Sequence, residues 1–131
     1  MIALDTNVLV RLLVFDEPRQ AERSRRLVEQ ATSKDESIFL SSIVLCELVW
    51  VLGGAVDAPK KDIVATLNRL LDSELFVFEN TELLRKAIER FTSGRADFAD
   101  YLLGEVASDA GASVTFTFDR TLQHEPGFSL V

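Results

Sequence analysis

Residues 1–18 have the sequence MIALDTNVLVRLLVFDEP, in which a short apolar run is followed directly by an acid and then by apolar residues at helical spacing. The run Met1–Leu4 predicts a buried strand, and Thr6–Phe15 predicts the helix into which it leads. Asp5 stands at the junction. In open parallel α/β sheets ligands bind at the carboxyl ends of the strands, so Asp5 is expected where a site would form.

The alternation of strand and helix continues along the chain. Further strands are predicted at Ile38–Leu40, Leu75–Phe78 and Ser113–Phe118, with a last edge strand at Phe128–Val131. Helices are predicted between them, at residues 19–32, 42–52, 59–71, 81–92 and 97–109. On the helix at 19–32, the residues expected to face the core are Ala21, Leu27, Val28 and Ala31. This order predicts an α/β fold, a mostly parallel sheet with helices on both faces.

Composition and charge narrow the class of protein. The chain has 131 residues, 47% of them apolar, and this favours a single domain with a buried core. Its formal net charge of −7 repels phosphate polymers at long range. A nucleic-acid partner would therefore be held locally, by arginines and bound cations. The single cysteine, Cys46, excludes an intrachain disulfide and fits a cytoplasmic location.

Residues 37–56 imitate a membrane span, because they carry a single charge, that of Glu47. A segment of this length could cross a bilayer. Serines and glycines interrupt it, however, and an acid in mid-span would be costly. We interpret the segment as a buried strand followed by a buried helix. No signal peptide is predicted at the N-terminus, and no membrane association is expected.

Glu47 and Asp5 are the first candidate site residues. At helical spacing Glu47 shares a stripe with Ile43, Val44 and Val51. An ionised carboxylate on an apolar face is costly unless it is paired or bound to metal. The alternative for Glu47 is a structural ion pair with an arginine, and the alternative for Asp5 is a simple helix N-cap.

Three more acids follow in the second half of the chain. Asp97 and Asp100 fall on one side of the first turn of a predicted helix, where they could instead form a cap, with Asp97 as N-cap. Gly104 and Ala107, one and two turns after Asp100, are expected to leave room for something to approach that acid. Asp119 directly follows a predicted strand, although it could be a turn residue.

These acids together favour a metal site. Four acids at one edge of a sheet would repel each other without a counter-charge, and hard divalent cations take oxygen ligands. Carboxylates without histidine or thiolate partners suit Mg²⁺ or Mn²⁺ rather than Zn²⁺. Such a cluster can orient water, lower its pKa and neutralise a phosphodiester in the transition state.

Four segments, in this order, resemble the motifs of the PIN domain and, more narrowly, those of VapC, the toxin of VapBC type II toxin–antitoxin systems. They are DTNVLVRLL at residues 5–13, ELVWVL at 47–52, DFADYLL at 97–103 and TFTFDR at 115–120. The resemblance spans the whole chain. It implies one three-layer PIN domain over residues 1–131, Mg²⁺-dependent RNA cleavage, inhibition by a cognate VapB-type antitoxin, and a homodimer.

The resemblance also implies roles for single residues. By position, Asp5, Glu47, Asp100 and Asp119 match the four acids of the family, and Thr117 matches a hydroxyl that supports catalysis, as does Thr6. Asp5 and Asp100 match the positions usually credited with metal; Glu47, Asp97 and Asp119 are further candidate ligands. The cations expected to receive RNA phosphates are Arg11, Arg95 and Arg120. Residues 53–56, GGAV, depart from the basic and aromatic residues of many relatives.

Two other functions remain open from the sequence. An Mg²⁺-dependent phosphatase or phosphotransferase would also place an Asp after its first strand. Enzymes of the haloacid-dehalogenase type need a second Asp two residues later, where this chain has Asn7. The other alternative is a catalytically inactive PIN-like module that only binds RNA.

Overall fold

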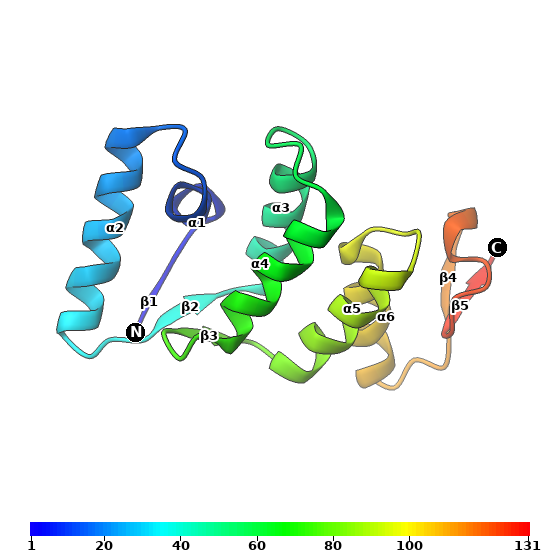
Figure 1. Cartoon of the computed structure of the whole chain (residues 1–131). Helices are drawn as coiled ribbons and strands as arrows, with labels where there is room; N and C mark the ends of the chain where they lie inside the picture. Colours follow the sequence, from blue (N-terminus) through cyan, green and yellow to red (C-terminus); the bar gives the residue numbers. More distant parts are fainter. The chain divides into compact units, whose positions relative to one another are not determined.

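The computed structural model describes all 131 residues. The chain folds into two compact units, Met1–Glu79 and Asn80–Val131. Figure 1 traces the chain through six α-helices and five strands. All strand pairs are parallel. The predicted α/β class with parallel strands is therefore confirmed.

A three-stranded sheet forms in the first unit. Its strands are β1 (Ile2–Ala3), β2 (Ile38–Leu40) and β3 (Phe76–Phe78), in the order β1-β2-β3. Ile2 pairs with Ile38, and Ile38 pairs in turn with Phe76. Ile38 and Leu40 have no exposed surface, so the central strand lies within the apolar core of this unit.

Four helices complete the first unit, and each begins where its sequence provides a start signal. They are α1 (Thr6–Leu13), α2 (Pro18–Ser33), α3 (Ser42–Gly53) and α4 (Lys60–Asp72). Ser41 caps α3, because its hydroxyl accepts a hydrogen bond from the amide of Val44. Helix α1 packs against α2 and α3, and α3 packs against α4.

Two helices and a two-stranded sheet form the second unit. The helices are α5 (Thr81–Ser93) and α6 (Phe98–Asp109); the strands are β4 (Thr115–Thr117) and β5 (Phe128–Leu130), joined through the 3₁₀ turn η1 (Arg120–Leu122). Helix α5 packs closely on α6, and the rings of Phe91 and Phe98 meet edge to face with centroids 6.1 Å apart.

Every predicted strand and helix is present, with small shifts at the ends. The first helix ends at Leu13, so the prediction that it includes Phe15 is wrong, and Phe15 is exposed. On α2 the buried residues are Ala21, Ser24 and Ala31. Leu27, predicted to face the core, is 40% exposed. No helix is both long enough and apolar enough to cross a membrane.

Gly104 of α6 has a packing role that its sequence neighbours do not suggest. A Cβ atom at this position would lie 2.6 Å from the ring of Phe128 on β5. The prediction that the small residue leaves an approach to Asp100 is therefore wrong, since the space is filled by an aromatic ring. Glycine at this position allows β5 to pack closely on α6.

Gly104→Ala is expected to destabilise the protein by about 1–3 kcal/mol, because the new methyl group overpacks the contact with Phe128. In an open helix the same change would stabilise by about 0.5–1 kcal/mol. Gly53→Ala is the matched control, since its Cβ would meet Ile63 at an ordinary 3.6 Å. Urea unfolding of both variants measures the difference. A Gly104→Ala variant more stable than the wild type would contradict this packing.

Candidate active site

Asp5 lies between β1 and α1, as predicted, and is exposed. Its Oδ1 accepts a hydrogen bond from the amide of Thr6 at 2.8 Å, which makes it the N-cap of α1. The cap fixes the direction of the carboxylate. It uses one of the two oxygens and leaves Oδ2 without a partner.

Glu47 projects from α3 toward the start of α1, where the buried hydroxyl of Thr6 donates a hydrogen bond to its Oε1 at 3.2 Å. The carboxylate itself is exposed, and the buried face of α3 consists of Val44, Leu45, Leu48, Val49 and Leu52. Of the residues predicted to share its stripe, Val44 is buried, Val51 is half-buried and Ile43 is 70% exposed. The expectation that Glu47 lies on a buried apolar face is therefore wrong, because its face of the helix is open to solvent at Ile43 and at Trp50, which is 56% exposed.

Asp97 and Asp100 form a capping box at the start of α6. Asp97 Oδ1 accepts from the amide of Phe98 at 2.9 Å, and Asp100 Oδ2 accepts from the amide of Asp97 at 3.2 Å. The capping interpretation of Asp97 is thus confirmed. Both acids also lie where the positive end of the helix dipole favours a negative charge.

Asp119 follows β4 and begins η1. Its Oδ1 accepts hydrogen bonds from the amide and the hydroxyl of Thr121, at 2.9 and 2.7 Å. The hydroxyl of Thr117 accepts from the amide of Asp119 at 3.0 Å. Thr117, predicted as a supporting residue, therefore holds the backbone of Asp119. Sequence reasoning missed Thr121, although an Asp followed two residues later by Thr is the spacing of a local side-chain turn.

Of the three candidate acids of the second unit, Asp97 and Asp119 affect the pKa of Asp100. Burial raises the pKa of the Asp100 carboxyl above its ordinary value; the hydrogen bond from Asp97 opposes this, while the negative charges of Asp97 and Asp119 add to it. By contrast, the hydrogen bonds from Thr121 hold the pKa of Asp119 below its ordinary value. The ionised form is therefore favoured at Asp119 and disfavoured at Asp100.

The raised pKa of Asp100 predicts a pH-dependent effect of its neutral analogue. A carboxyl whose pKa is higher in the folded chain stabilises folding below its unfolded pKa, about 3.9, and loses that contribution as pH rises through the folded pKa. Asp100→Asn has no charge to repel Asp119 and keeps an oxygen for the Asp97 amide. In the absence of metal, its melting temperature relative to the wild type should rise from pH 4 to pH 7. A constant difference would contradict the assignment.

The unused oxygens of these acids fit a hard cation. Asp5, Glu47, Asp100 and Asp119 each commit one carboxylate oxygen to hydrogen bonds and keep the other without a partner. None of the four forms an ion pair with lysine or arginine. Free carboxylate oxygens without nitrogen or sulfur donors are what Mg²⁺ prefers.

Other acids of the second unit show the contrast. Glu105 and Glu125 pair with Arg90, at 3.2 and 3.7 Å, and Glu125 also accepts from the hydroxyl of Tyr101. Both carboxylates thus share a cationic partner within the fold, which the four candidate acids lack. Within either unit, no group of three or more acidic, histidine or cysteine side chains converges as metal ligands would. The first unit supplies Asp5 and Glu47, and the second supplies the remaining candidates.

A comparison with protein families identifies the fold. The model of the family described as PIN domain matches residues 2–126. The chain belongs to the PIN-domain family. PIN domains are typically metal-dependent nucleases that use divalent ions such as Mg²⁺, and their substrates are nucleic acids, RNA among them. No curated protein matches the chain. In this PIN domain, the acids at the carboxyl ends of β1 and β4 are Asp5 and Asp119.

Proposed function

We propose that the protein is a Mg²⁺-dependent ribonuclease and, more narrowly, a toxin of the VapC type. The observation that carries this proposal is that Asp5, Glu47, Asp100 and Asp119 each keep a carboxylate oxygen that no cation of the protein neutralises. A PIN domain with an intact set of unpaired acids is better suited to metal-assisted hydrolysis than to binding alone.

Asp5 and Asp100 are the proposed Mg²⁺ ligands, with Glu47, Asp97 and Asp119 as additional ones, and Mn²⁺ as an alternative ion. When bound, the ion would lower the pKa of water and neutralise charge on the phosphodiester. The chain's own groups position these acids. The cap at Thr6 orients Asp5, the Thr6 hydroxyl orients Glu47, and Thr121 keeps Asp119 ionised.

Glu47 and Asp119 are proposed to orient the attacking water by accepting its hydrogen bonds, and Thr117 supports Asp119 through its backbone amide. By analogy with the family, water attacks phosphorus and the 3′ oxygen leaves, giving 5′-phosphate and 3′-hydroxyl ends. Arg95 and Arg120, both exposed, are the proposed contacts for flanking phosphates.

Cleavage of total cellular RNA by the purified protein tests the nuclease. We expect discrete fragments in Mg²⁺ or Mn²⁺, no fragments in EDTA, and 5′-phosphates on the products, detectable by ligation. Hydrolysis of p-nitrophenyl phosphate without RNA cleavage would favour the phosphatase instead. RNA binding without any cleavage would favour the inactive module.

The proposed toxin role is tested in cells, because a cytoplasmic ribonuclease that is inhibited by a VapB-type antitoxin should be harmful when that antitoxin is absent. Induced expression in a bacterial host should arrest growth, and Asp5→Asn should not. Co-expression of a small open reading frame adjacent to the gene should restore growth and form a complex with the protein. Size-exclusion chromatography tests the expected homodimer. Growth unaffected by the active protein would contradict the toxin role.

A further inference from the structure

A groove between α1 and α2 of the first unit encloses a cavity of about 540 Å³. Three arginines line it, Arg11, Arg23 and Arg26, and no acidic side chain does. The charged part of the lining is thus entirely cationic, in a chain whose net charge is −7. Its volume is within the range of about 300–1,000 Å³ that is typical of ligand sites.

The arginines of the groove differ in how far they are neutralised. Arg11 donates to Asp16 through Nη1 and to Gln20 through Nε, both at 2.7 Å. Arg26 donates only through Nε, to Glu22 at 2.9 Å. Arg23 has no hydrogen bond or ion pair, and its side chain is exposed. Arg23 and the outer nitrogens of Arg26 therefore remain available to an anion.

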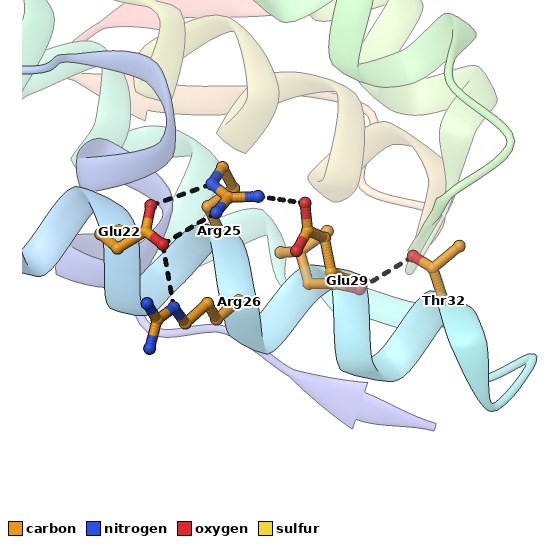
Figure 2. A network of polar contacts seen from close by, with 6 residues as sticks. Glu22, Arg25, Arg26, Glu29 and Thr32 are labelled. Atoms are coloured by element: carbon orange, nitrogen blue, oxygen red, sulfur yellow. Dashed lines mark hydrogen bonds and ion pairs between the residues drawn. The ribbon is translucent and has the colours of Figure 1, made fainter.

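Both acids of α2, Glu22 and Glu29, are bound by Arg25, which does not line the groove, and Glu22 also accepts from Arg26, which does. Arg25 binds Glu22 through Nη2 and Nε and pairs with Glu29 through Nη1, as Figure 2 shows. The hydrogen bonds from Arg25 and, next, from Arg26 hold the pKa of Glu22 down at about 2, so Glu22 stays ionised. The negative charges on α2 are thus held on the flank of the helix, outside the groove lining.

We propose that this α1–α2 groove binds the backbone phosphates of single-stranded RNA. The identity of the ligand rests on the proposed ribonuclease function. A guanidinium matches a phosphate with two parallel hydrogen bonds, and Arg23 is free to make them. Asn7 lines the same groove in the first turn of α1, two residues after Asp5. A strand bound in the groove therefore contacts the helix that the candidate catalytic residue Asp5 caps.

The rest of the lining suits nucleotides. Val8 and Leu27 provide apolar surface on which a base can lie, and the amide groups of Asn7 and Gln30 can both donate to and accept from base edges. An acidic peptide would be recognised by its negative charges, and the uncharged amide groups do not contribute to that recognition.

Binding of a fluorescein-labelled, single-stranded RNA oligonucleotide, measured by anisotropy in EDTA, separates this groove from catalysis. Arg23→Ala should weaken binding about fivefold at 0.1 M salt and reduce the slope of log affinity against log salt by about 0.7, as expected for one lost phosphate contact. Arg19→Ala is the matched control: it removes the same formal charge from an exposed, unpaired arginine of the same helix, outside the groove, and should change affinity by less than about twofold. Circular dichroism checks that α2 remains folded, as alanine permits.

Each result has one meaning for the groove. Wild-type affinity in Arg23→Ala, or an equal loss in Arg19→Ala, would overturn the proposal, since the effect would then be absent or due to overall charge. A Glu-rich peptide whose binding requires Arg23 while RNA binding does not would overturn it in favour of a protein partner. If RNA binding depends on Arg23 but no metal-dependent cleavage occurs, the groove stands and the ribonuclease proposal fails. If the protein cleaves RNA in a metal-dependent way but RNA binding does not depend on Arg23, the ribonuclease proposal stands and the groove proposal fails.

Discussion

Asp5→Asn and Asp100→Asn are each expected to lower the rate of Mg²⁺-dependent RNA cleavage by more than about 100-fold. Loss of a residue that only supports a metal ligand commonly costs about 10- to 100-fold, and a ligand should cost more. The folded structure should survive. Asparagine caps helices as well as aspartate does, so Asp5→Asn can keep the bond to the Thr6 amide. Initial cleavage rates at saturating Mg²⁺ measure the effect.

Two further variants calibrate that result. Asp109→Asn removes an exposed acid at the far end of α6 and should cleave at the wild-type rate. Asp97→Asn preserves the N-cap of α6, so retained activity would assign Asp97 to capping alone, and a loss comparable to that of Asp100→Asn would assign it to the metal. An Asp5→Asn enzyme as active as the wild type would refute the proposed site.

Phe98→Ala is expected to have the largest effect on stability. The ring of Phe98 is fully buried at the start of α6 and meets the ring of Phe91 edge to face. Removing such a ring typically costs about 3–5 kcal/mol, a large part of the stability of a small protein. Phe116→Ala, at a position that is 66% exposed, is the control and should stay within about 0.5 kcal/mol of the wild type.

The same variant tests whether residues 1–131 unfold as one domain. Trp50, the only tryptophan, lies in the first unit, whereas Phe98 lies in the second. If the chain is one cooperative domain, Phe98→Ala will shift the urea midpoint of Trp50 fluorescence by as much as that of circular dichroism. An unchanged fluorescence midpoint beside a lowered circular-dichroism midpoint would contradict the prediction of a single domain.

The fold was largely predictable because local signals agree with the structure. Pro18 begins α2, Ser41 caps α3, Asn80 caps α5, and Asp97 caps α6, each at a position where the sequence carries a start signal. Short runs of β-branched and aromatic residues correctly predicted the positions of the strands. The pairing of β4 with β5 apart from the three-stranded sheet was not predicted, because sequence patterns identify strands but not their partners.

The candidate acids were predictable as residues but their partners were not. Apolar spacing placed Glu47 on a buried stripe, whereas the helix turns it outward, where the Thr6 hydroxyl reaches it. Helical spacing predicted open space beside Gly104, whereas the ring of Phe128, 24 residues later in the sequence, fills that space. Both errors concern contacts between residues distant in sequence. Local periodicity carries no information about them.

Calorimetric titration of Mn²⁺ and Mg²⁺ into the wild type, Asp5→Asn and Asp100→Asn measures metal binding without RNA. We expect the wild type and Asp109→Asn to bind divalent metal, and either substitution at Asp5 or Asp100 alone to remove that binding. Wild-type metal affinity in both Asp5→Asn and Asp100→Asn would contradict the claim that these two acids hold the ion.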